Sequence, residues 1–182
     1  NLAQAVLVVA YEWFKLAGTG LPFAMPQKSP PAPKQQLESF FRDLERERDK
    51  VDFVVGPIFS NVLVAIHKPV MDSGKILIST NAGASSFAGV ACNPNFFVTS
   101  YQNDQNFETL GKVATDKGYK RVYAMVPNYQ AGKDALAGFK RAYKGEIVEE
   151  SLVPLNNLDF QADLSKLNAM KPDALFTFMP GG

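Results

Sequence analysis

The stretch Val51–Asn61, "VDFVVGPIFSN", decides the fold because a buried-strand pattern ends abruptly within it. Its first five residues, apolar except for Asp52, form a run of the kind found in strands covered on both faces. Gly56 and Pro57 end that run, and Ser60 with Asn61 then offers a hydroxyl and an amide. Open α/β sheets bind their ligands at such strand ends. We therefore predict a buried strand followed by a binding loop.

The rest of the chain repeats this alternation of strand and helix. Strands are predicted at 51–55, 75–79, 120–126, 146–153 and 173–179. Helices are predicted at 1–18, 35–50, 60–74, 103–118, 131–145 and 159–170, with a Pro-rich connection between the first two. Ser60 is the expected cap of its helix, and Pro69 should kink or shorten that helix. Strands that alternate with helices of this length indicate crossover units and a mainly parallel sheet.

Composition and charge exclude several classes of function. Hydrophobic residues make up 46% and charged residues 20% of the 182, and the net charge is +1, so no nucleic-acid or anionic-membrane surface is indicated. Glu12 and Lys15 interrupt the apolar first segment, which is too short for a membrane span and lacks the basic start of a signal peptide. We interpret that segment as a core helix.

Motifs for catalysis and metal binding are absent from the sequence. Cys92 is the only cysteine and is expected to be a small buried side chain, whereas His67, the only histidine, is expected to be partly exposed on a helix. "PNYQAGKD" fails as a phosphate loop, because Pro127 replaces its first Gly and Asp134 its Ser or Thr. We predict no enzyme, no cofactor and no metal site. An α/β enzyme whose catalytic residues lie outside this chain is a minor alternative.

Small and polar residues follow the strands. "GPIFSN", "STNAGASS", "PNYQAG" and "MPGG" come directly after four of them. Because the carboxyl ends of parallel strands share one edge, these loops should converge there, next to helix N-termini that favour anions. The sequence therefore predicts a pocket for a small polar or anionic group. The alternative, that each loop is simply a capped turn, stays open.

Several stretches taken in order resemble one family. They are "DKVDFVVGPIFSNV", "ILISTNAGASSFAG", "CNPNFFVTSYQND", "KGYKRVYAMVPNYQAGKDALAGFKRAYKGE" and "LDFQADLSKLNAMKPDALFTFMPGG". Together they are similar to the substrate-binding proteins of ABC importers of the leucine/isoleucine/valine-binding type. The resemblance implies an α/β fold of two Rossmann-like lobes with parallel sheets flanked by helices, the type I periplasmic-binding fold. The lobes would be residues 1–99 and 100–182, and relative to the family the chain would be incomplete at both ends.

The resemblance also implies where a ligand is held. Lobe closure around a carboxylate would use Thr99, Ser100 and Tyr101 as a hinge. The ligand-contacting positions would be Phe59, Ser60, Asn61, Asn81, Ala82, Gly83, Tyr129, Gln130 and Pro180. The leucine-binding members have a Thr near Gly83 that is missing here. "ISTNAG" and "NPNFF" look closer to relatives that take aromatic or other hydrophobic carboxylates.

The resemblance implies transport. The expected function is an extracytoplasmic solute-binding protein that delivers a branched-chain or hydrophobic amino acid, or an aromatic acid, to an ABC importer. Its partners would be the ligand and the membrane permease, and the protein would be a monomer in the periplasm, or lipid-anchored at the surface of a Gram-positive cell. The alternative is a ligand-sensing domain of a transcriptional regulator or receptor, because fold does not fix function.

Overall fold

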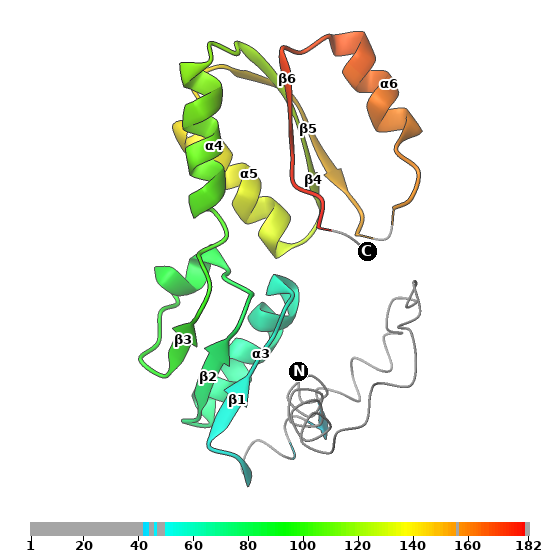
Figure 1. Cartoon of the computed structure of the whole chain (residues 1–182). Helices are drawn as coiled ribbons and strands as arrows, with labels where there is room; N and C mark the ends of the chain where they lie inside the picture. The colour runs from blue at the N-terminus through cyan, green and yellow to red at the C-terminus, as the bar shows by residue number, and fades with distance from the viewer. Residues whose placement is uncertain (1–41, 44–45, 47–49, 156, 181–182) are drawn as a thin grey trace, which may run out of the picture. The chain divides into compact units, whose positions relative to one another are not determined.

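The structure, a computed structural model, describes residues 42–43, 46, 50–155 and 157–180. The helices expected at 1–18 and 35–50 lie wholly or largely outside these residues. Two compact units divide the chain, one of residues 1–82 with 92–100 and one of residues 83–91 with 101–182. In the described part each unit carries a three-stranded sheet (Figure 1). The predicted lobes, 1–99 and 100–182, stay a prediction.

The sheet of the first unit is parallel and has β2 at its centre. Its strands are β1 (Phe53–Val55), β2 (Ile76–Ser79) and β3 (Phe96–Val98), in the order β1-β2-β3. Helix α3 (Ser60–Asp72) follows β1, as predicted. Its buried side chains recur at i, i+3, i+4 and i+7, the spacing of a helix face turned to a core. They are Leu63, Ile66, His67 and Val70.

Burial in β1 differs from the prediction. Val54 is 8% exposed, but Phe53 is 56% and Val55 40% exposed, so the expectation of cover on both faces is wrong for this strand. Successive side chains of a strand point to opposite faces. Of the described helices, α3 is the one with substantial contacts to this sheet. Because α3 covers one face of the sheet, the side chains of β1 are buried on that face alone.

The start and end of α3 also depart from expectation. Phe59 is the residue that caps the helix, without a side-chain hydrogen bond, and Ser60 is already its first helical residue. The predicted Ser60 cap is therefore wrong. The helix runs through Pro69 to Asp72, so Pro69 does not end it. Strand β3 was not predicted, because its three residues follow a loop rather than a full helix.

The second unit has a parallel sheet with β4 at its centre. Its strands are β4 (Arg121–Pro127), β5 (Glu146–Val153) and β6 (Ala174–Thr177), in the order β5-β4-β6. The helices are α4 (Gln105–Asp116), α5 (Gln130–Ala142) and α6 (Gln161–Met170), with a short 3-10 helix η2 (Ser85–Ala88). All three strands and all three α-helices fall where the sequence predicts them.

Alternate residues of β4 face two different cores, because side chains of a strand alternate between the two sides of its sheet. Val122, Ala124 and Val126 pack with residues of α4 and α5. Tyr123 and Met125 face the other side, where partly buried residues of α6 pack against them. The unit therefore has three layers, with α4 and α5 on one face of the sheet and α6 on the other (Figure 1).

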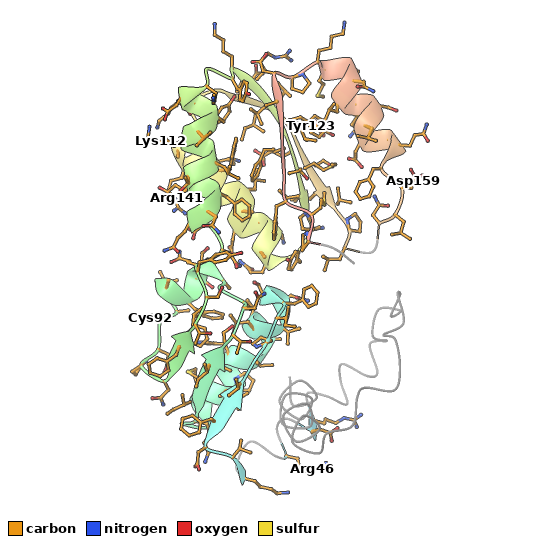
Figure 2. All side chains as sticks on the ribbon, in the orientation of Figure 1. Arg46, Cys92, Lys112, Tyr123, Arg141 and Asp159 are labelled. Atoms are coloured by element: carbon orange, nitrogen blue, oxygen red, sulfur yellow. The ribbon has the colours of Figure 1, made fainter. Side chains whose placement is uncertain are left out.

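Glycines let α4 and α5 approach closely. A Cβ added to Gly111 would lie 2.3 Å from the Phe139 carbonyl oxygen, and one added to Gly138 would lie 2.3 Å from the Asp104 carbonyl oxygen. Arg141 of α5 fastens the contact, with its guanidinium 2.6 Å from an Asp104 oxygen (Figure 2). Burial raises the pKa of Asp104, but several hydrogen bonds, the largest in effect from Arg141, and the charge of Arg141 together outweigh it, so this pKa lies below its usual value. The start of α4 is thus fixed against α5.

Cys92 lies in an irregular segment after η2 and is exposed (Figure 2). The prediction that its side chain is buried is wrong, because it sits in neither a strand nor a helix face. Among the described helices, none has the length and apolar character needed to cross a membrane.

Candidate ligand-binding loops

The loops that follow β1 and β2 are hydrogen-bonded to each other. The Asn81 side-chain amide donates to the Ile58 carbonyl at 2.9 Å, and the Ala82 N–H donates to the Pro57 carbonyl at 3.3 Å. The Gly56 N–H donates to the Ile78 carbonyl at 3.0 Å. Gly56 has a φ of 120°, a backbone conformation that favours glycine. Loops about 23 residues apart in sequence therefore meet at the carboxyl edge of this sheet, as the sequence predicts.

Ser79 shapes the second of these loops and was not singled out from the sequence. Its side chain is fully buried, and its hydroxyl donates to the Ala82 carbonyl at 2.5 Å. Its own carbonyl accepts the Thr99 N–H at 3.0 Å. A hydroxyl at the last position of an otherwise apolar strand, "KILIS", was the available signal.

The predicted contacts in the first unit differ in exposure. Phe59 is 45% exposed, Asn61 and Asn81 are exposed, and Ser60 and Ala82 are buried. The first turn of α3 contains no acidic residue, so no side chain of that turn offsets the positive end of the helix dipole. This end of the unit suits a small anion flanked by an aromatic ring.

The second unit presents a similar strand-to-helix loop after β4. Tyr129 caps α5 with extended backbone, and Gln130 is the first helical residue. The loop is fastened by the Asn128 N–H, which donates to the Val153 carbonyl at 2.6 Å. Burial, and then the charge of Tyr101, raises the pKa of Tyr129. Its phenol therefore keeps its proton at neutral pH and can donate to a carboxylate.

A buried carboxyl group, Asp134, holds Gln130. The Gln130 side-chain amide donates to Asp134 Oδ1 at 2.9 Å. Asp134 Oδ2 accepts the Ser85 N–H at 3.2 Å and the Asn103 side-chain amide at 2.9 Å. Sequence reasoning used Asp134 only to reject a phosphate loop. Its partners lie 49 and 31 residues away along the chain, and no local pattern connects them.

Gly83 and Pro180 are the remaining predicted contacts. A Cβ added to Gly83 would lie 2.2 Å from the Tyr101 carbonyl oxygen, so no side chain fits at this position. The Asn103 N–H donates to the Gly83 carbonyl at 2.8 Å. Pro180 is exposed and lies just beyond β6.

The predicted hinge residues lie where the chain passes between units. Thr99 and Ser100 belong to the first unit and Tyr101, 54% exposed, to the second. The role of these three residues as a hinge stays a prediction.

His67 and the acidic residues form no metal-binding group within the described ranges. His67 is 8% exposed, and its ring meets the Phe96 ring edge-on at 5.1 Å between centroids. The expectation that it is partly exposed is wrong, because it lies on the buried stripe of α3. No cluster of three His, Cys, Asp or Glu that could hold a metal ion occurs among the residues described.

Parallel sheets with helices beside them, and loops gathered at the carboxyl ends of the strands, define an α/β fold of the ligand-binding type. A family model described as periplasmic binding protein matches residues 44–182. The chain belongs to this family, whose fold is the type I periplasmic-binding fold.

Individual relatives support the same assignment. The chain is 30% identical over 139 residues to Leu/Ile/Val-binding protein homolog 6 of Brucella abortus, an alignment that covers 74% of this chain and 35% of that protein. The chain thus spans about a third of the length of the curated relatives it matches.

Solved structures of solute-binding proteins are also similar. One from an ABC transporter of R. palustris, in complex with benzoate, has a TM-score of 0.74 and 30% identity, covering 83% of this chain and 42% of that one. The branched-chain amino acid transporter substrate binding protein of Streptococcus pneumoniae, in complex with isoleucine, has a TM-score of 0.66 and 25% identity, covering 82% and 43%. These relatives are binding proteins of transporters and not enzymes.

Proposed function

We propose that this chain is part of an extracytoplasmic solute-binding protein that delivers a small carboxylate to an ABC importer. The protein would act in the periplasm, or lipid-anchored at the surface of a Gram-positive cell, and its second partner would be the membrane permease. Membership of the periplasmic binding protein family supports this location and role.

The observation that carries the proposal is the hydrogen-bonded meeting of the loops after β1 and β2. Asn81 and Ala82 are held against the "GPIF" loop at the N-terminal end of α3. A carboxylate there would accept hydrogen bonds worth about 1.5–3 kcal/mol each and gain about 0.3–2 kcal/mol from the helix dipole. Ser60 and Asn61, at the start of the helix, are the proposed partners of the ligand.

The second unit would complete the site when the protein closes. Its proposed contacts are Gly83, Tyr129, Gln130 and Pro180, with Thr99, Ser100 and Tyr101 as the hinge. A ligand shifts an open–closed equilibrium only by its differential affinity for the two states. Contacts made only in the closed state would therefore drive closure, and the closed form is what the permease would recognise.

We propose an aromatic or other hydrophobic carboxylate as the ligand class. Phe59 offers a ring that is 45% exposed, and Tyr129 a half-buried phenol. The Thr near Gly83 that the leucine-binding members would use to hydrogen-bond an amino acid is missing in this chain. The R. palustris relative that binds benzoate is also more similar to this chain than the isoleucine-binding relative.

A thermal-shift screen of the full-length protein tests the proposal. The compounds are benzoate, 4-hydroxybenzoate, leucine and isoleucine, each over a range of concentrations. A ligand that binds only the native state raises the melting temperature as its concentration rises. We expect that rise for at least one aromatic acid. A melting temperature unchanged by all four compounds would contradict the proposed function.

A further inference from the structure

Asp134 is a buried carboxyl group whose surroundings are unusual. Its side chain is 7% exposed, and both oxygens accept hydrogen bonds: Oδ1 from Gln130, and Oδ2 from the Ser85 N–H and the Asn103 side chain. These three partners are uncharged donors. Burying a carboxyl group is costly unless it is well hydrogen-bonded.

Its three partners come from three separate segments of the second unit. Ser85 lies two residues after the chain enters this unit at Gly83, and Asn103 lies two residues after the chain enters it again at Tyr101. Gln130 begins α5 beside Tyr129. The hydrogen bonds to Oδ2 therefore hold the carboxyl group against the segments that contain Ser85 and Asn103. The hydrogen bond to Oδ1 in turn holds the Gln130 side chain against this fixed carboxyl group.

We propose that Asp134 is a positioning residue that holds the Gln130 side chain in place for the ligand. This inference rests on the proposed function, because it takes Gln130 to be a ligand contact. The Gln130 side chain is flexible, with three carbon atoms beyond Cα. Its hydrogen bond to Asp134 orders it before the ligand binds, which lowers the entropic cost of binding. Asp134 itself does not touch the ligand in this account.

The substitution Asp134→Asn tests this with almost no change of shape. All three partners of Asp134 donate, so in D134N the amide nitrogen either faces the Ser85 backbone N–H, which cannot reorient, or requires the Gln130 amide to turn over and accept instead. We expect D134N to raise the Kd for benzoate or leucine, whichever binds the full-length protein, by about fivefold or more. Isothermal titration calorimetry measures that change.

A double-mutant cycle separates positioning from a general structural effect. If Asp134 acts through Gln130, D134N should change the Kd by less than about twofold in a Gln130→Ala background. The matched control is Asp173→Asn in the same unit, since Asp173 Oδ2 also accepts two backbone N–H groups, of Lys120 and Arg121, at 2.7 and 2.9 Å. D173N should leave the Kd unchanged. If D134N does not fold, Asn103→Ala, which removes one bond from Oδ2, takes its place in the cycle.

The outcomes are distinct. An equal loss of affinity from D134N with and without Gln130, or no loss at all, overturns the inference and leaves the proposed function standing. A Gln130→Ala variant with wild-type affinity also overturns it. A wild-type protein whose melting temperature is raised by none of benzoate, 4-hydroxybenzoate, leucine and isoleucine overturns the proposed function, and this inference with it.

Discussion

At the scale of single residues, burial sets the chemistry of His67. The ring is 8% exposed, lies on the apolar stripe of α3 and meets Phe96 edge-on. Burial lowers the pKa of His67 below its ordinary value of 6.5, because the charged imidazolium would lose its hydration. The neutral ring therefore behaves as part of the core.

This burial predicts a dependence of stability on pH. With a lowered folded-state pKa, the unfolded chain takes up the proton first, so stability is fully present above about pH 6.5 and is lost as the pH falls through the folded pKa. We expect the free energy of unfolding of the wild-type full-length protein to fall more between pH 7.5 and 5 than that of a His67→Leu variant. Denaturant unfolding at each pH measures both. Parallel pH profiles of the two proteins would contradict the burial of the neutral ring.

At the scale of elements, the start of α5 depends on a glycine. Gly132, in the first turn, lies against the end of β4, and an added Cβ would be 1.9 Å from the Pro127 carbonyl oxygen. The close contact fixes the turn that carries Tyr129 and Gln130. Because the contact is between the backbone of Gly132 and the backbone of Pro127, neither side can move aside easily.

The substitution Gly132→Ala should therefore destabilise the protein. Helix propensity alone favours Ala over Gly by about 1 kcal/mol, but the clash with backbone should outweigh it and give a net loss of about 1–3 kcal/mol. Chemical denaturation measures the sign. The control is Ala137→Gly on the exposed side of the same helix, which should lose about 1 kcal/mol from propensity alone. A G132A variant more stable than wild type would show that Gly132 and the Pro127 carbonyl do not lie in close contact.

Most elements of the second unit could be predicted from the sequence because their patterns are long and periodic. Positions 136 and 139 of α5 and position 143, its C-cap, follow the predicted helix spacing, and all three side chains are buried. Strand β3 was missed because it follows a loop rather than a full helix, so the alternation of strand and helix does not mark it. The Ser60 cap was wrong by one residue, because a Ser directly before an apolar run suits the cap or the first turn equally well.

At the scale of the whole molecule, the order of motifs along the sequence and the contacts between distant segments carry different information. The ordered motifs were enough to predict the family, and the position of loops after parallel strands was enough to predict that Asn81 lies near the "GPIF" loop. The Asp134 network joins segments far apart in sequence, and no single segment shows it. The burial of His67 was readable from its spacing to Leu63 and Val70, a signal that its polar character obscured.

The central claim is that a carboxylate is bound where α3 begins. It is tested most directly by calorimetric titration of the full-length Ser60→Ala variant with the carboxylate that binds the wild-type protein. The matched control is Ser73→Ala at the opposite end of α3, where the hydroxyl donates to the Val70 carbonyl at 2.7 Å. We expect the Kd of S60A to rise about tenfold or more, and that of S73A to stay at the wild-type value. A Kd for S60A equal to that of the wild type would contradict the account.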